Sequence, residues 1–522
     1  MEKPNDYKWV VMIFLAGDNN LSENCLFSLR DMKRAGVIPD TAVLAQYDPF
    51  EVMQPIPTQR YVINAAARRK TPNPEGLILA DLRGVLDETN TGAAETLAAF
   101  IFWSVTNFRA DHYMLVLWGH GSGTAEDFLL RDENPPDALS IPELKDAFRL
   151  AKKRLEDVGL PETVLGPEGK IDILGMDSCL MSTGEVGYEV REHARYLVGS
   201  ESFEANMGWP YKRILPHLNE PKITPREFAT LIVDEYVKFY FDFIATGRSV
   251  DLGACDLTQS ERFREAVKLL AAVLRRGLRF DRLKDAIVLA HWEAQGYKFD
   301  EYIDLFDFCA VLEARCEQII KELQGQGTPR GKEAAHTAQD LKKLARKINE
   351  ACRAVRGVLL PGREPADCEG LRRAPHAAGA APTPPFILKS CFSGAQFQYS
   401  YGVSIYFPWA RVSFNYGNLD FADQTGWNNF LREYVELTRR CPRKDSEVVR
   451  ESPTKSKGPD DDKQGSTKNP PTRWFINDCL HKLIGGDFDQ AQALLSRVQP
   501  NDDAPTDRPM TDHEADSPAR HR

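Results

Sequence analysis

Two loops place chemically reactive side chains directly after apolar segments of the chain. The first loop, Trp118–Gly123, contains His120, and the second loop, Met176–Met181, contains Cys179. An imidazole next to a thiol promotes formation of the thiolate, which is the reactive form of cysteine, and later protonates a leaving amine. The glycines around His120 let a substrate approach and offer backbone N–H groups to a developing oxyanion. The pattern is typical of a cysteine nucleophile paired with a histidine base.

Each loop, taken alone, also fits a more ordinary role. A cysteine at a strand end is usually a small buried apolar residue, and a single histidine is often a turn or core residue. A phosphate-binding loop at Gly121–Gly123 lacks the glycine spacing and the Lys-Ser/Thr pair of that motif. Ser122 does not fit a serine-hydrolase elbow, because His120 occupies the place of its first glycine. The Cys–His pair is favoured because both residues follow buried strands at equivalent positions.

The segments around these loops predict an α/β fold. Mostly apolar strands separated by amphipathic helices indicate a parallel sheet covered on both faces, which is an α/β sandwich. Ligands bind such sheets at the carboxyl ends of the strands, where His120 and Cys179 would share a crevice. The strands predicted in the first half of the chain are Trp9–Leu15, Ala42–Tyr47, Tyr113–Trp118, Ile171–Met176 and Tyr196–Gly199.

Composition divides the chain into a catalytic half and C-terminal additions. The predicted parts are a catalytic core at 1–255, a helical region at 256–440 with a Pro/Ala/Arg-rich insertion at 325–385 and a returning strand at 402–408, a disordered linker at 441–472, a helical module at 473–498 and a disordered tail at 499–522. The helical module is too small for a large core. We expect it either to dock on the catalytic core or, slightly favoured, to recruit a partner protein.

Charge and composition exclude several classes of protein. The 522 residues carry a net charge of −10, which argues against a nucleic acid or an anionic membrane as partner. None of the ten cysteines lies in a Cys-x-x-Cys pair, so we expect neither a disulfide framework nor a zinc module. The first residues lack a signal-peptide pattern, and the apolar runs are shorter than the ~20 residues of a membrane-spanning helix. We therefore expect a soluble, cytoplasmic protein.

The chain resembles the clostripain-like cysteine peptidases, which are relatives of caspases and gingipains, from about residue 7 to about residue 440. The resemblance rests mainly on the blocks around His120 and Cys179, in this order and each after an apolar strand. Shorter matching blocks are Leu15–Leu21, Gly199–Glu201, Gly208–Tyr211, Tyr302–Leu305, Gly402–Pro408 and Thr425–Trp427. The resemblance implies a caspase-like α/β/α sandwich with a mostly parallel sheet and helical C-terminal additions, and a cysteine endopeptidase activity.

The same resemblance assigns the catalytic roles. It implies that His120 is the catalytic histidine, that Cys179 is the nucleophile, and that the backbone N–H groups of Gly121 and Cys179 form the oxyanion hole. The chain departs from the family at Ser178, where alanine is usual. Because serine is also small, we expect the loop geometry to be kept.

Acidic residues near the nucleophile match the family's primary specificity (S1) pocket. Asp177 corresponds to the acidic pocket residue, which implies a basic P1 side chain, with Arg preferred over Lys because a guanidinium pairs bidentately. A loop-capping carboxylate is the alternative role for Asp177. Glu201 and Glu204 follow the next strand and are weaker candidates for the same pocket. Asp18 and Asn19 resemble residues of a loop at the edge of the active site, where they either fix the loop or touch substrate.

Activation is a separate expectation. Members of the family often mature by cleavage at a basic residue between the catalytic histidine and cysteine. The segment Thr124–Ser140 is predicted to be a polar loop that contains Arg131, and its two prolines disfavour regular structure. The helix predicted after it offers four further candidate processing sites, Lys145, Lys152, Lys153 and Arg154. Cleavage here, by the enzyme itself or by an upstream protease, and an uncut surface loop are equal alternatives.

The resemblance also sets the expected partners and leaves two competing functions open. The expected partners are protein or peptide substrates with a basic P1 residue, an activating protease and a protein recruited by the C-terminal helices. The competing functions are a catalytically silent caspase-like scaffold and a small-molecule amidase. No cofactor is predicted. Some relatives need calcium, but the chain has no Asp-x-Asp-x-Asp-Gly calcium loop.

Overall fold

The computed structural model describes residues 6–50, 56–64, 81–124, 129–241, 249–297, 301–325, 332–361 and 384–439. Internal contacts divide the chain into two compact units, Met1–Val435 and Glu436–Arg522. The predicted linker, helical module and tail, from residue 441 onward, lie outside the described residues, so those expectations stay predictions. Within the described residues, no helix has the length and apolar character needed to cross a membrane.

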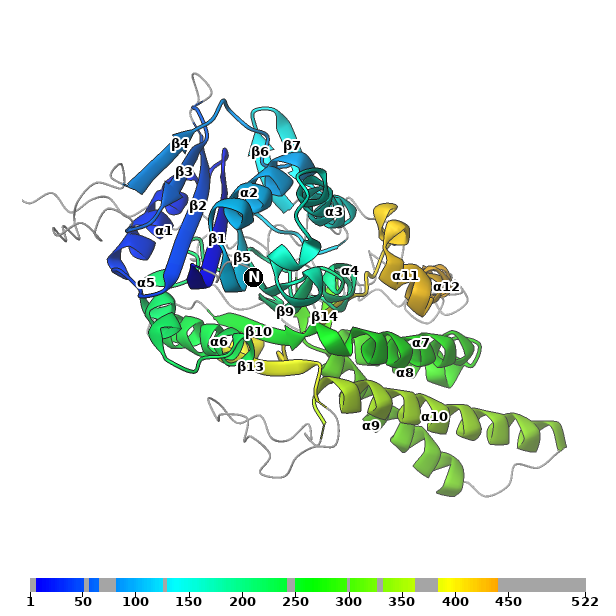
Figure 1. Cartoon of the computed structure of the whole chain (residues 1–522). Coiled ribbons are helices and arrows are strands. Elements are labelled where there is room, and N and C mark those ends of the chain that lie inside the picture. The colour runs from blue at the N-terminus through cyan, green and yellow to red at the C-terminus, as the bar shows by residue number, and fades with distance from the viewer. Residues whose placement is uncertain are drawn as a thin grey trace, which may run out of the picture. The chain divides into compact units, whose positions relative to one another are not determined.

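A nine-stranded sheet forms the centre of the first unit (Figure 1). Its strands in spatial order are β13 (Ile387–Ser393), β10 (Val250–Asp256), β9 (Ala194–Gly199), β8 (Ile171–Asp177), β5 (Ala110–Trp118), β1 (Tyr7–Gly17), β2 (Thr41–Pro49), β3 (Gln59–Val62) and β4 (Leu82–Val85). The five strands from β9 to β2 run parallel to one another. Antiparallel strands complete both edges.

Helices cover both faces of this sheet because its central strands are apolar on both sides. In β1, Met12 and Phe14 belong to the core that includes helices α2 and α3, whereas Val11 and Ile13 belong to the core that includes α1 and α6. The helices of this half are α1 (Ser22–Arg34), α2 (Ala94–Asn107), α3 (Ile141–Asp157), α4 (Gly184–Val190), α5 (Tyr211–Ile214) and α6 (Pro225–Phe241). The predicted α/β/α sandwich with a central parallel sheet is confirmed.

The second half of the described chain adds helices and a small sheet. The helices are α7 (Ser260–Gly277), α8 (Asp281–Glu293), α9 (Leu305–Gly325), α10 (Lys332–Leu359), α11 (Asp420–Thr425) and α12 (Trp427–Arg439). The small sheet has the order β11 (Gly296–Tyr297), β12 (Tyr302–Asp304) and β14 (Ser404–Tyr406). The predicted C-terminal helical additions are therefore present. Strand β13 of this half joins the large sheet beside β10, and the domain boundary at residue 255 stays a prediction.

Two segments differ from their predicted local structure. Strands β3 and β4, which are absent from the predicted strands, complete one side of the large sheet, and the predicted loop Thr124–Ser140 contains a hairpin of β6 (Leu129–Glu133) and β7 (Pro136–Leu139). These short strands are antiparallel and only partly buried, so their sequences mix polar and apolar residues and lack a continuous apolar run. The two prolines of the hairpin fit this structure, because Pro135 lies in the turn and Pro136 is the first residue of β7.

Candidate active site

The predicted histidine and cysteine loops both begin at the carboxyl ends of central strands of the sheet. β5 and β8 are parallel neighbours, and Trp118 at the end of β5 is aligned with Asp177 at the end of β8. His120 and Cys179 each lie two residues beyond this aligned pair. The backbone N–H of Gly119 donates to the Asp177 carbonyl oxygen at 3.2 Å, which extends the pairing past the strand ends. The register therefore holds the two residues at equivalent positions in adjacent loops.

Gly121 brings the two loops into backbone contact. A Cβ atom built on Gly121 would lie 2.4 Å from the carbonyl oxygen of Cys179 and 3.1 Å from its backbone nitrogen. No side chain fits in this space, so glycine is required for the loops to approach each other. The two residues predicted to form the oxyanion hole consequently lie side by side.

His120 is held by a residue from a third strand end. Its Nε2 forms a 2.7 Å hydrogen bond with Oδ1 of Asn20, in the loop that follows β1. Burial of the half-buried imidazole lowers the pKa of His120 below its ordinary value, and the nearby Arg131 cation lowers it further. The neutral imidazole that results at pH 7 is able to accept a proton, as a general base must. Sequence patterns alone do not single out Asn20 as a partner of His120, although its position after the strand next to β5 is a usable signal.

The Cys179 thiol is largely enclosed by protein. Its Sγ accepts a hydrogen bond from the backbone N–H of Glu204 at 3.3 Å. Burial raises the pKa of Cys179 above its ordinary value, against the effect of this N–H, and the Asp177 carboxyl raises it further. In this state the thiol is protonated at neutral pH, so it needs a base to become a nucleophile.

The carboxylate of Asp177, two residues before Cys179, is held by hydrogen bonds from neighbouring residues. Its Oδ2 accepts hydrogen bonds from the backbone N–H of Trp209 at 2.9 Å and from the hydroxyl of Tyr211 at 2.7 Å. Burial raises the pKa of Asp177 to about 6. Burial, and then the charge of Asp177, raise the pKa of Glu204 well above its usual range. The charge of Asp177 therefore disfavours ionisation of the neighbouring Glu204.

Glu201 contacts a different group from Asp177. Its carboxylate accepts a hydrogen bond from the backbone N–H of Gly402 at 2.7 Å. Burial, and then the neighbouring carboxyls of Asp304 and Asp251, raise the pKa of Glu201 well above its ordinary value. The structure thus joins Asp177 with Glu204 next to Cys179, and it joins Glu201 with residues of the second half of the chain.

The loop after β1 is hydrogen-bonded to the β6–β7 hairpin. Asn19 donates from its side-chain amide to the carbonyl oxygens of Ala16 at 3.0 Å and Arg131 at 2.6 Å, which shows a loop-fixing role. Asp18, Glu88 and Asp132 each offer a carboxylate oxygen, and these atoms lie within 4.8 Å of one another. Oxygen ligands of this kind suit a hard cation.

Two of the three carboxylates of this group, those of Asp18 and Asp132, already have protein partners. Asp132 accepts hydrogen bonds from the backbone N–H and the hydroxyl of Thr91. It also accepts one from the backbone N–H of Asn134, whose side chain donates to Asp18. Burial, and then the charge of Asp132, raise the pKa of Asp18 to about 6. Calcium dependence stays an open expectation.

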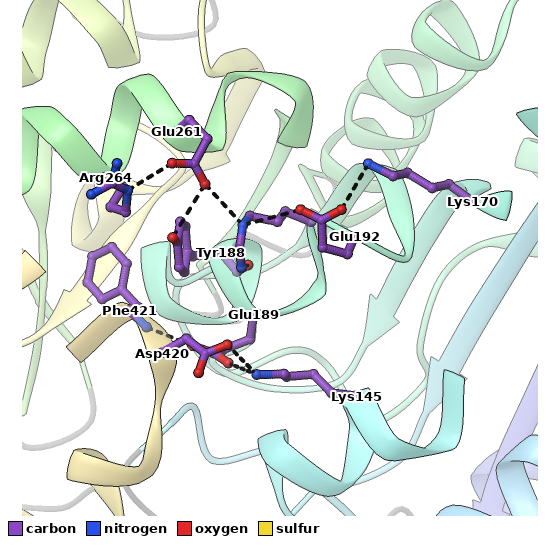
Figure 2. Close-up of polar contacts among 10 residues, drawn as sticks. Lys145, Lys170, Tyr188, Glu189, Glu192, Glu261, Arg264, Asp420 and Phe421 are labelled. Carbon is purple, nitrogen blue, oxygen red and sulfur yellow. Dashed lines mark hydrogen bonds and ion pairs between the residues drawn. The ribbon is translucent and has the colours of Figure 1, made fainter. Parts of the chain in front are cut away.

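The five candidate processing sites lie in regular secondary structure. Arg131 belongs to β6 and is 44% exposed, with its guanidinium 3.5 Å from Glu133. The other four lie in α3 and are Lys145, Lys152, Lys153 and Arg154. Lys145 is paired with Glu189 at 2.7 Å and with Asp420 at 2.6 Å (Figure 2). Residues 125–128 of the predicted loop lie outside the described residues.

Comparison with protein families decides the relationship. The family model described as the clostripain family matches residues 13–325, which is more than half of the chain. The chain belongs to the clostripain family. The matched region of this clostripain-family chain includes both loops of the candidate site, and the predicted family resemblance is confirmed.

Individual relatives of this clostripain-family chain are distant. Clostripain from Hathewaya histolytica is 28% identical over 144 residues, and the match covers 25% of each protein. A second similar protein is a secreted cysteine protease from Bacteroides thetaiotaomicron, whose structure was solved in complex with an irreversible peptide inhibitor. Its sequence is 15% identical to this chain, and the two structures superpose with a TM-score of 0.49. The alignment covers 81% of this chain and 99% of that one. The structure of an inactive zymogen protease from Parabacteroides distasonis is 16% identical with a TM-score of 0.46 and the same coverage.

The directions of the two pKa shifts predict how the resting thiol reacts. Because the pKa of Cys179 is raised and that of His120 is lowered, the resting pair is thiol and imidazole, not thiolate and imidazolium. We expect alkylation of Cys179 by iodoacetamide to be slow at pH 7 and to rise about tenfold per pH unit toward pH 9. Mass spectrometry of the Cys179 peptide measures this rate.

The same measurement on His120→Ala is the control. The slope should be unchanged in this variant, because the imidazole does not ionise the resting thiol. A rate that is already at its plateau at pH 7 in the wild type, and that loses this plateau in His120→Ala, would show a preformed ion pair and contradict the prediction.

Proposed function

We propose that this protein is a cysteine endopeptidase with Cys179 as nucleophile and His120 as general base. The observation that carries the proposal is the register of β5 and β8, which places the two residues in adjacent loops that touch at Gly121. Membership of the clostripain family supports the same assignment. The presence of both residues argues against the alternative of a silent scaffold.

The chemistry of a cysteine nucleophile and a histidine base gives the order of steps. His120 accepts the proton of the Cys179 thiol, and the sulfur attacks the peptide carbonyl carbon to form a tetrahedral intermediate. The backbone N–H groups of Gly121 and Cys179 donate to its oxyanion. The imidazolium then protonates the leaving amine, and the C–N bond breaks to leave a thioester. Water, deprotonated by His120, hydrolyses this thioester and restores the thiol.

We also propose that Asp177 and Glu204 select a basic P1 side chain. Both carboxyls are buried, which raises their pKa values, and a bound cation would favour the ionised form of both. A guanidinium can pair with carboxylate oxygens through two parallel hydrogen bonds, whereas an ammonium acts as a point charge. We therefore propose Arg at P1 in preference to Lys.

A cytoplasmic location stays a prediction.

Removal of either catalytic side chain should abolish peptide cleavage. We expect hydrolysis of fluorogenic peptides that end in Arg, and more weakly of those that end in Lys, with little cleavage after Asp or Asn. In His120→Ala the rate should fall at least about 10²-fold, because general base catalysis contributes about 10²- to 10⁴-fold. In Cys179→Ala no turnover should remain. Activity that survives Cys179→Ala would defeat the proposal.

Replacement of the pocket carboxylate should change specificity and leave the nucleophile intact. In Asp177→Asn we expect kcat/KM for Arg peptides to fall about 10- to 100-fold, from loss of a charge-assisted hydrogen bond of about 1.5–3 kcal/mol. Alkylation of Cys179 should persist. Asp172→Asn is the matched control, because Asp172 is a buried aspartate near the opposite end of the same strand, where it contacts His112. Equal losses in both variants would indicate a general structural effect and argue against the pocket role.

Among the five processing candidates we propose Arg131, because it lies half-exposed in a two-stranded hairpin. The other four belong to a helix, which must unwind before it fits a protease cleft. Intact-mass analysis should show two fragments with a cut after Arg131 in the wild type. Arg131→Gln and Cys179→Ala should each remain one uncut chain. A single uncut mass for the purified wild type would rule out self-processing.

A further inference from the structure

A tyrosine from the second half of the chain reaches the loop that follows the candidate catalytic histidine. Tyr302 is the first residue of β12 and is fully buried. Its hydroxyl oxygen accepts a hydrogen bond from the backbone N–H of Thr124 at 2.9 Å and donates to the carbonyl oxygen of Ser122 at 3.2 Å. One phenol thus fixes the backbone on both sides of Gly123, two to four residues after His120.

The loop is shaped to receive this ring. Gly123 has a φ of +77°, in the left-handed region that side-chain-bearing residues rarely adopt. A Cβ atom built at Gly123 would lie 2.5 Å from Cζ and from the hydroxyl oxygen of Tyr302. Glycine is therefore needed twice, for the turn of the backbone and for the close approach of the phenol.

The strand beside Tyr302 holds the other catalytic loop. β14 pairs with β12, so that Tyr302 is aligned with Tyr406 and Asp304 is aligned with Ser404. The backbone N–H of Ser404 donates to the carbonyl oxygen of Ser182 at 3.0 Å, three residues after Cys179. The hydroxyl of Ser182 in turn donates to the carbonyl oxygen of Gly402 at 2.7 Å.

Helix α4, which follows the cysteine loop, is fixed by the same half of the chain. The buried carboxylate of Glu185 accepts hydrogen bonds from the backbone N–H of Tyr406 at 2.9 Å and the hydroxyl of Tyr416 at 2.8 Å. One turn further on, Glu189 accepts from the backbone N–H of Phe421 at 2.8 Å (Figure 2). The cysteine loop is therefore anchored independently of the contacts that Tyr302 makes.

We propose that Tyr302 is a positioning residue for catalysis: its hydroxyl fixes the loop after His120 relative to the loop after Cys179, which β14 holds. This inference rests on the proposed function and names a further residue for it. Tyr302 acts through the backbone of Ser122 and Thr124. Because misplacement of a catalytic group by about 1 Å can cost about 10²-fold in rate, loss of this hydroxyl should act on the chemical step.

Tyr302→Phe tests the proposal, because it removes the hydroxyl and keeps the ring against Gly123. With an Arg-ending fluorogenic peptide we expect kcat to fall about 10- to 100-fold while KM changes less than about threefold. Alkylation of Cys179 at pH 9, which requires no alignment with His120, should proceed at the wild-type rate.

Tyr297→Phe is the matched control. Tyr297 is a buried tyrosine of the same small sheet, and its hydroxyl lies 2.6 Å from the Ser400 hydroxyl, which belongs to neither catalytic loop. We expect wild-type kcat from this variant and similar melting temperatures for the two variants. A wild-type kcat in Tyr302→Phe would overturn the proposal. An equal loss of kcat in Tyr297→Phe, or a melting temperature lowered in Tyr302→Phe alone, would show a merely structural role and also overturn it.

Failure of the proposed function gives a different result. If the wild-type protein shows no hydrolysis that depends on Cys179, the endopeptidase assignment is wrong. The proposed role of Tyr302 is then wrong as well, because it rests on that assignment. Hydrolysis that depends on Cys179, combined with an unaffected Tyr302→Phe, would overturn the role of Tyr302 alone.

Discussion

The backbone contact between Gly121 and Cys179 is the constraint on which the rest of the site depends. It exists because β5 and β8 are adjacent parallel strands whose last residues are aligned, so both loops leave the sheet at the same place. A slip of one residue in register would move every side chain of a strand to the opposite face of the sheet and disrupt the packing of both faces. The packing of the sheet therefore fixes the relative position of the loops. The absence of a side chain at residue 121 then lets them touch.

Removal from water is the main electrostatic effect throughout this site. Burial lowers the pKa of His120 and raises the pKa values of Cys179, Asp177 and Glu204. Each shift favours the neutral form of the group. Under the proposed function, a basic P1 side chain next to Asp177 would favour the ionised carboxylate, which burial disfavours.

Local sequence signals predicted the central strands of the sheet and the two loops that follow β5 and β8, because apolar runs and glycines report directly on buried strands and close approach. The short antiparallel strands β3 and β4 and the β6–β7 hairpin were harder to predict, because they carry no continuous apolar run. Partners distant in sequence could not be inferred locally. Asn20 contacts His120 across 100 residues, and Tyr302 contacts Thr124 across 178 residues. Glu201 and Glu204 looked equivalent in sequence, but their side chains face different carboxyls.

The second half of the chain is more than an addition to the catalytic half, because β12 and β14 contact the loops that carry the two reactive residues. The most direct test of this account is a crystal structure of the protein inactivated by a peptidyl ketone inhibitor that ends in Arg. We expect a covalent bond from Cys179 Sγ, the ketone oxygen within hydrogen-bond distance of the Gly121 N–H, and the guanidinium next to Asp177. An adduct on another residue, or an oxygen that points away from Gly121, would contradict it.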